Sequence, residues 1–120
     1  MTIRVGEVGK KIYVITSYDM SSNTSLQIIA VPPSGETNQK TWTATLQTST
    51  LSNITLEDGT AVTTVAANES MYYETSAATD LDEAGTWTLI GKFTNTSATP
   101  DDVFISDPVT LVVSDDNYSA

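Results

Sequence analysis

The chain has 120 residues, which is the usual size of one domain and too short for two separate hydrophobic cores. Fifteen acidic residues against five basic ones give a formal net charge of −10, so the surface repels nucleic acid and anionic membranes. Cysteine and histidine are both absent, which excludes disulfides and thiolate metal sites and removes the commonest general base. We therefore expect a single domain over 1–120 with a core at about 4–113, a flexible tail at 114–120, no cofactor and no enzymatic activity.

The N-terminal sequence MTIRVGEVGKKIYVI has no uninterrupted apolar region of the kind found in export signals. No part of the chain approaches the run of about 20 apolar residues that a membrane helix needs. These features predict a protein that is made in the cytoplasm and is not inserted in a membrane.

The first half of the chain predicts strands. Threonine and serine are abundant and apolar residues do not recur at helical spacing, so an all-β fold is expected. The first strand, at 11–17, is apolar on both faces, which predicts that both faces are partly covered. A second strand at 26–31 ends at an exposed Pro-Pro-Ser-Gly turn, and a third at 41–46 alternates with Trp42 facing the core.

The second half continues this pattern. After a loose polar stretch at 47–53, strands at 54–56 and 61–65 flank Asp58-Gly59, which is typical of a tight hairpin. Strands at 71–75 and 86–94 follow, the latter with Trp87, Leu89, Gly91 and Phe93 facing inward. A loop at 95–102 leads to a last strand at 103–113, where Asp107-Pro108 predicts a bulge or an edge position because proline cannot donate to a ladder.

The most specific local pattern is the acidic turn from Asp80 to Gly85, followed at once by Trp87. In immunoglobulin-like sandwiches an aromatic residue at such a corner fixes the chain as it passes from one sheet to the other. We expect Asp82 to accept hydrogen bonds from backbone amides there, with Gly85 and Trp87 completing the corner. The predicted architecture is an immunoglobulin-like β-sandwich of about seven to eight antiparallel strands.

The same turn offers a candidate metal site. Asp80, Asp82 and Glu83 lie close enough in sequence to coordinate Ca²⁺, which binds carboxylate and carbonyl oxygens in flexible geometry. The spacing lacks the glycine and terminal glutamate of a helix-loop-helix calcium loop, and a solvated acidic turn is the alternative interpretation.

Four motifs carry a resemblance to a known family: Val-Gly-x-x-Gly at 5–9, Trp-x-Ala at 42–44, Tyr-x-Thr at 73–75 and the acidic Gly-Thr-Trp corner at 80–87. Together they resemble the immunoglobulin-like domain of tailed-bacteriophage virion proteins, similar to the N-terminal domain of the phage baseplate upper-protein family. The resemblance spans about 4–113. It implies a non-enzymatic structural protein, present in multiple copies in the virion, that docks on other phage proteins of the tail, baseplate or head-to-tail region.

Two other functions stay open. One is a capsid decoration protein on the phage head, and the other is a carbohydrate-binding module that holds a host-surface glycan. A glycan module needs exposed aromatic residues on one sheet face, whereas Trp42 and Trp87 are both predicted to lie in the core.

Several segments are candidates for docking, namely the termini, the edge strands and the hairpin around Asp58-Gly59. We expect docking through the N-terminal segment, because it is apolar enough to pair with a neighbour and has no evident internal partner. Its residues are Thr2, Ile3, Arg4 and Val5.

Overall fold

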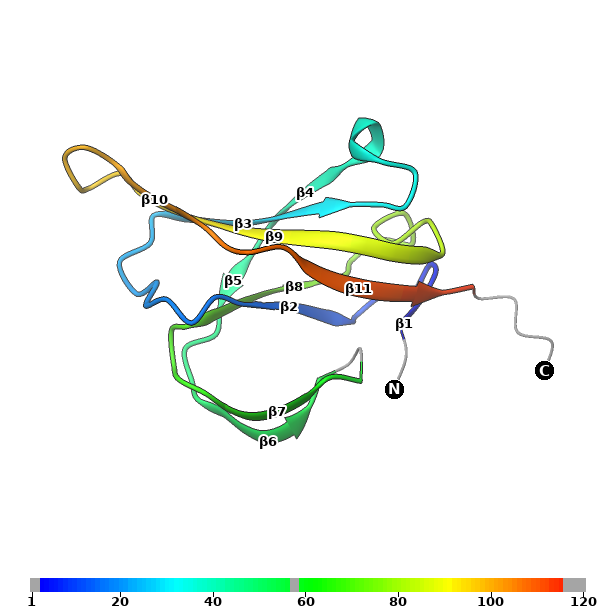
Figure 1. Cartoon of the computed structure of the whole chain (residues 1–120), viewed down its shortest axis with the longest axis horizontal. Coiled ribbons are helices and arrows are strands. Elements are labelled where there is room, and N and C mark those ends of the chain that lie inside the picture. The colour runs from blue at the N-terminus through cyan, green and yellow to red at the C-terminus, as the bar shows by residue number, and fades with distance from the viewer. Residues whose placement is uncertain (1–2, 57–58, 116–120) are drawn as a thin grey trace.

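The computed structural model describes residues 3–56 and 59–115 (Figure 1). Within them the protein is all-β, as predicted, with eleven strands and one short 3₁₀ turn. Their bounds are β1 Ile3–Arg4, β2 Lys11–Ile15, β3 Ser25–Val31, η1 Glu36–Asn38, β4 Lys40–Thr43, β5 Thr45–Leu46, β6 Leu51–Thr55, β7 Ala61–Val65, β8 Ser70–Glu74, β9 Gly85–Asn95, β10 Asp102–Ile105 and β11 Val109–Ser114. The strands outnumber the seven to eight expected because β1 is added and two of the predicted strands are divided.

Two sheets and a hairpin make up the fold. The larger sheet has the order β1-β11-β9-β3-β4, with β10 also paired to β9, and the smaller sheet has the order β2-β8-β5. The hairpin of β6 and β7 curves away beneath the smaller sheet (Figure 1). All pairs are antiparallel except β1 with β11, which is parallel.

The main core lies between the two sheets. On β9 the alternate residues are buried, as their spacing predicted. Trp42 and Trp87 are 5% and 0% exposed, so both belong to the core as expected. The buried members of this core are Ile3, Ile12, Val14, Met20, Leu26, Ile28, Ala30, Trp42, Met71, Leu81, Trp87, Leu89, Phe93, Leu111 and Val113.

The prediction of one continuous strand at 41–46 is wrong. The Ala44 amide still donates to the Leu26 carbonyl at 2.9 Å, but Thr45 already pairs with Tyr72 of β8. The chain therefore leaves the larger sheet and joins the smaller one at this point. Alternation of side chains continues through the switch, so the sequence pattern does not reveal it.

The strand predicted at 103–113 is interrupted where the bulge was expected. Ile105 lies opposite Lys92 and Val109 lies opposite Leu89, so four steps along one strand face three along the other. One extra residue is accommodated by the bulge. Ser106 stabilises the bulge through two hydrogen bonds to Gly91. Its amide donates to the Gly91 carbonyl at 2.9 Å, and its hydroxyl accepts a hydrogen bond from the Gly91 amide at 2.8 Å.

The hairpin confirms the pairing of the two short strands but corrects one boundary. β6 begins at Leu51, inside the stretch that was expected to be loose, because Leu51 is buried in a second apolar cluster. Leu51, Leu56 and Val62 form this cluster, and Tyr13 and Ile15 of β2 pack against it. The outer face of β2 is therefore covered, as its apolar composition predicted. Asp58 of the predicted turn lies outside the described residues.

Candidate functional site

The corner between β8 and β9 carries the chain from the smaller sheet to the larger one, as the sequence predicted. Asp80 fixes its first turn. The Asp80 Oδ2 atom accepts hydrogen bonds from the amides of Ser76 and Ala77, at 2.8 and 3.1 Å, and from the Tyr73 hydroxyl at 2.8 Å. This is the role that the sequence analysis assigned to Asp82, so that prediction is wrong.

These contacts set the acidity of Asp80. Partial burial raises the pKa of its carboxyl, but hydrogen bonds from Ser76, Tyr73 and Ala77 outweigh burial, with a further contribution from the Lys40 charge. The net result is a pKa below the ordinary value, which favours the ionised form at neutral pH. Asp80 therefore acts as a charged anchor for the turn.

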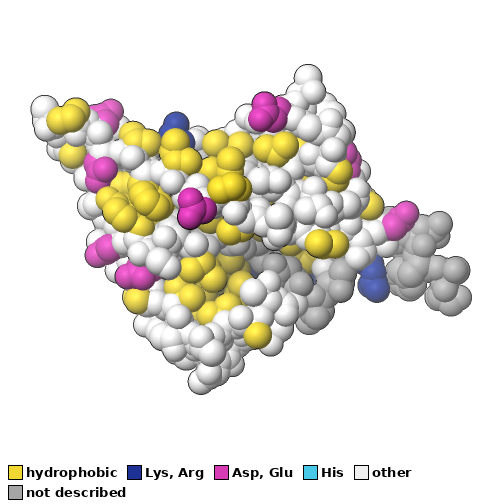
Figure 2. All heavy atoms as spheres, in the orientation of Figure 1, with side chains coloured by type: hydrophobic (Ala, Val, Ile, Leu, Met, Phe, Trp, Pro, Cys, Tyr) yellow, Lys and Arg dark blue, Asp and Glu magenta, His cyan; other side chains and the backbone are white. Residues whose placement is uncertain are grey.

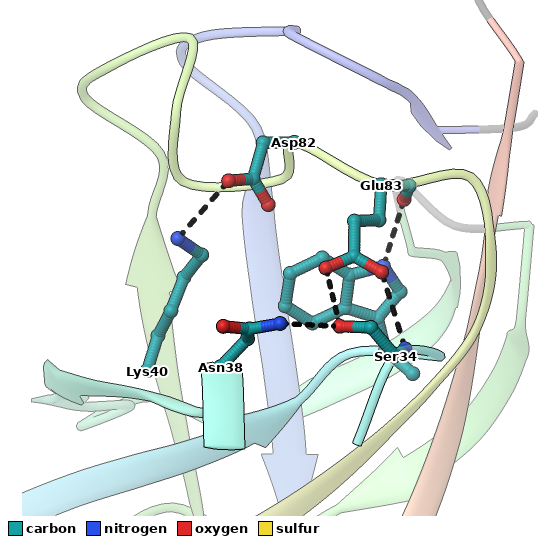
Figure 3. A network of polar contacts seen from close by, with 6 residues as sticks. Ser34, Asn38, Lys40, Asp82 and Glu83 are labelled. Carbon is teal, nitrogen blue, oxygen red and sulfur yellow. Dashed lines mark hydrogen bonds and ion pairs between the residues drawn. The ribbon is translucent and has the colours of Figure 1, made fainter. Parts of the chain in front are cut away.

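Asp82 and Glu83 bind a different part of the chain (Figure 3). Asp82 forms an ion pair with Lys40 of β4 at 3.4 Å. The Glu83 carboxylate accepts hydrogen bonds from the amide and hydroxyl of Ser34, at 3.1 and 2.7 Å, and Asn38 donates to the same hydroxyl at 2.9 Å. The corner is thus tied to the turn that follows β3.

The Trp87 indole anchors the end of this corner. Its Nε1 atom donates to the main-chain carbonyl of Glu83 at 2.9 Å (Figure 3). Gly85 lies between them with φ of 126°, and a Cβ atom placed there would lie 2.7 Å from Cγ of Pro33. The predicted structural role of Gly85 and Trp87 at the corner therefore agrees with the geometry, and glycine is required by both backbone and space.

The candidate calcium site at Asp80, Asp82 and Glu83 is not assembled in the structure. The three carboxylates point to three separate partners: the turn after β8, Lys40 and Ser34. Across residues 3–56 and 59–115, no group of three Asp, Glu, His or Cys side chains is placed to hold a metal ion. The acidic turn is explained by structural contacts instead.

The N-terminal segment expected to dock on a neighbour has an internal partner. Ile3 and Arg4 form β1 alongside Val113 and Ser114, and the Val5 amide donates to the Ser114 carbonyl at 3.0 Å. Ile3 is buried in the core. The premise that this segment lacks an internal partner is therefore wrong, while Thr2 lies outside the described residues.

A shallow hollow lies between the hairpin and the sandwich. Its volume is about 420 Å³, and the described residues that line it carry apolar and hydroxyl side chains. The lining residues are Tyr13, Ile15, Leu56, Thr60, Pro108, Val109 and Thr110. Figure 2 shows hydrophobic side chains gathered where the hairpin meets the body of the molecule. Such a lining can hold an apolar group.

The second exposed feature is β10, which the sequence analysis treated as part of one long strand. Among the described strands it pairs with β9 alone, so its other edge is open. Val103 and Ile105 of this strand are 49% and 62% exposed. The alternation of these two residues around Phe104 was visible in the sequence, but only the pairing shows that they lie at an edge.

The four motifs that carried the family resemblance meet at one end of the sandwich. The Gly6 amide donates to the Leu81 carbonyl at 3.0 Å, and the Gly9 amide to the Thr75 carbonyl at 2.7 Å. The Trp42 ring stacks on Tyr73 with centroids 4.8 Å apart and lies 6.4 Å from the Trp87 ring. Segments that are distant in the sequence thus form one packed unit.

Comparisons of the chain with protein-family models, with curated proteins and with solved structures found no match. Within the described residues, no helix is long and apolar enough to cross a membrane.

Proposed function

We propose that this chain is a non-enzymatic, immunoglobulin-like structural module of a tailed-bacteriophage virion, docking on tail, baseplate or head-to-tail proteins. The strand order supports the fold assignment. The smaller sheet, β2-β8-β5, corresponds to strands B, E and D of an immunoglobulin domain, and β4-β3-β9-β11 corresponds to strands C′, C, F and G. The Trp87 to Glu83 hydrogen bond stands where many such domains use a tyrosine hydroxyl at the start of strand F.

The observation that carries the proposal is the convergence of the four resemblance motifs. Each motif contributes a contact to another, through the amides of Gly6 and Gly9 and the stacked rings of Trp42, Tyr73 and Trp87. The motifs therefore form one packed unit, and the resemblance of this unit to the phage family is what supports the virion role.

A docking role also fits the surface. The carboxylates of the acidic corner are used in structural contacts, and the described lining of the hollow beside the hairpin is made of apolar and hydroxyl side chains. Edge strands and apolar hollows instead suit contacts with other proteins.

The test is to purify particles from a producing culture, detect the chain by mass spectrometry and place it in averaged density. Copies in multiples of three or six around the tail axis support the tail or baseplate assignment, since tails are built with cyclic symmetry. Copies spread over the whole shell support the alternative, a capsid decoration protein. Absence of the chain from purified particles overturns both assignments.

A glycan-binding role is the second candidate, and one observation favours it. Tyr13 and Tyr72 lie opposite each other on the outer face of the smaller sheet, with ring centroids 5.3 Å apart, and both are half-buried. Paired aromatic rings beside a hollow can bind a sugar face. Binding on a glycan array that Tyr72→Ala abolishes would support this role, and no binding on an array of host-surface glycans would remove it.

A further inference from the structure

The open edge of β10 offers backbone hydrogen-bonding groups to a partner. The Ser106 amide donates to the Gly91 carbonyl, and these two residues continue the register of the β10 to β9 pairing. In an antiparallel ladder, the main-chain amide and carbonyl of successive residues point alternately toward the neighbouring strand and away from it. Phe104 therefore points its amide and carbonyl toward β9, whereas those of Val103 and Ile105 point toward the open edge.

Side chains at this edge provide apolar surface. Val103 and Ile105 are both exposed and share one face of the strand. Phe104 turns to the other face, where its ring stacks on Tyr18 with centroids 4.4 Å apart. A strand added here would cover the two aliphatic side chains and gain main-chain hydrogen bonds at once.

Charge decides which strand can be added. Acidic residues stand at both ends of β10, with Asp101 and Asp102 before Val103 and with Asp107 after Ile105. Tyr18 donates a hydrogen bond to Asp102 at 3.1 Å, and Lys92 lies opposite Ile105 on β9. Figure 2 shows acidic side chains beside hydrophobic ones at this end of the molecule.

This arrangement disfavours a second copy of the chain. Antiparallel pairing of two β10 strands places the acidic ends of one copy against the acidic ends of the other, and like charges opposite each other are destabilising. A strand with basic residues at its ends meets opposite charges instead.

We propose that the β10 edge accepts an extended segment of a neighbouring virion protein, one with alternating apolar residues and with lysine or arginine at its ends. This inference rests on the proposed function for the identity of the neighbour. The main-chain groups of Val103 and Ile105 hold the segment, and the acidic residues around them select its charge.

The direct test uses two capped peptides with the same alternating valine and threonine centre, one ended by lysines and one by glutamates. Amide hydrogen exchange of the isotopically labelled chain is followed by NMR. With the lysine peptide at about ten times its Kd, exchange at Val103 and Ile105 slows about tenfold. The glutamate peptide leaves both amides unchanged. Equal effects of the two peptides, or no slowing with the lysine peptide, overturn the proposal.

A proline variant tests the edge in the same way. Val103→Pro removes an outward amide and leaves the ladder to β9 intact, because proline is tolerated on edge strands when its amide side faces solvent. It abolishes binding of the lysine peptide. The matched control is Thr41→Pro on β4, the opposite edge of the same sheet, where the amide also points outward because Ala44 donates inward to Leu26. Loss of binding in both variants overturns the assignment to β10.

A charge variant covers the case in which the proline disturbs the fold. Asp101→Lys with Asp107→Lys reverses the charge at both ends while leaving the backbone groups in place. This double variant loses the lysine peptide and gains the glutamate peptide. An unchanged preference overturns the charge argument.

The two proposals fail in different ways. If the chain is found on particles but neither peptide binds, the virion role stands and the β10 inference is wrong. If the lysine peptide binds but the chain is absent from particles, the edge is an acceptor and the virion role is wrong.

Discussion

The Trp87 indole nitrogen lies 2.9 Å from the Glu83 carbonyl oxygen, while the indole nitrogen of Trp42, stacked beside it, is buried with no hydrogen-bond partner in the part of the chain that the structure describes. Two tryptophans of the same core thus differ in whether the indole nitrogen is hydrogen-bonded. The difference separates the contribution of the corner bond from that of ring burial.

Replacing each tryptophan with phenylalanine tests this contact. Both variants lose ring volume, but Trp87→Phe also leaves the Glu83 carbonyl without its donor, whereas Trp42→Phe removes an unsatisfied donor. We expect Trp87→Phe to lower the free energy of unfolding by about 1–3 kcal/mol more than Trp42→Phe. Urea denaturation measures both values, and equal losses would show that the corner bond contributes little.

Two buried serines provide a second matched pair. The Ser106 hydroxyl accepts the Gly91 amide at the bulge, while the Ser70 hydroxyl is buried and has no partner among the described residues. Ser106→Ala leaves a buried amide unpaired and should cost about 1–3 kcal/mol, whereas Ser70→Ala should be neutral or slightly stabilising. Thermal and urea unfolding measure the stability of both variants. A destabilised Ser70→Ala would mean that the Ser70 hydroxyl has a hydrogen-bond partner.

The alternation of apolar and polar side chains predicted those features of the fold that depend on neighbouring residues in the sequence. The inward face of β9, the burial of Trp42 and the bulge before Val109 all follow from the spacing of apolar residues and from Pro108. The parallel pairing of Ile3 with Val113 could not be predicted in this way, because the two residues lie at opposite ends of the chain and neither carries a local signal for the other.

The corner between β8 and β9 could likewise be predicted from the sequence only in part. Its position and its dependence on Gly85 and Trp87 were readable from the sequence, but the roles of Asp80 and Asp82 were not. Both carboxylates lie in one short turn, and which of them reaches the backbone amides depends on the direction in which the chain leaves β8. The open edge of β10 was hidden for a related reason, since strand pairing is not encoded in the alternation of a single strand.

Glycine at the corner is tested by adding one methyl group. Gly85 and Gly6 both have positive φ, 126° and 81°, but a Cβ atom at Gly85 would contact Pro33 at 2.7 Å, whereas one at Gly6 would have no atom within 4 Å. Gly6→Ala therefore reports backbone strain alone, at about 1–2 kcal/mol. We expect Gly85→Ala to lower the free energy of unfolding by a larger amount, measured by urea denaturation. Similar losses would mean that Pro33 moves aside without cost.

The lowered pKa of Asp80 makes part of the stability depend on pH. Because folding favours the ionised carboxylate, its contribution is complete above the unfolded pKa of about 3.9 and is lost as the pH falls through the lower folded pKa. Asp80→Asn cannot titrate, so its deficit in unfolding free energy relative to the native chain should be largest at neutral pH and should shrink below about pH 4.

Tyr73→Phe gives the intermediate case, because it removes one donor from Asp80 and leaves the amides of Ser76 and Ala77 in place. Losing that donor brings the folded pKa of Asp80 closer to its ordinary value. The pH-dependent part of the unfolding free energy therefore becomes smaller than in the native chain. It stays larger than in Asp80→Asn, which has no carboxyl at this position. Urea titrations between about pH 2 and pH 7 measure all three proteins. Parallel curves would mean that the turn is held by packing, with the Asp80 charge contributing nothing.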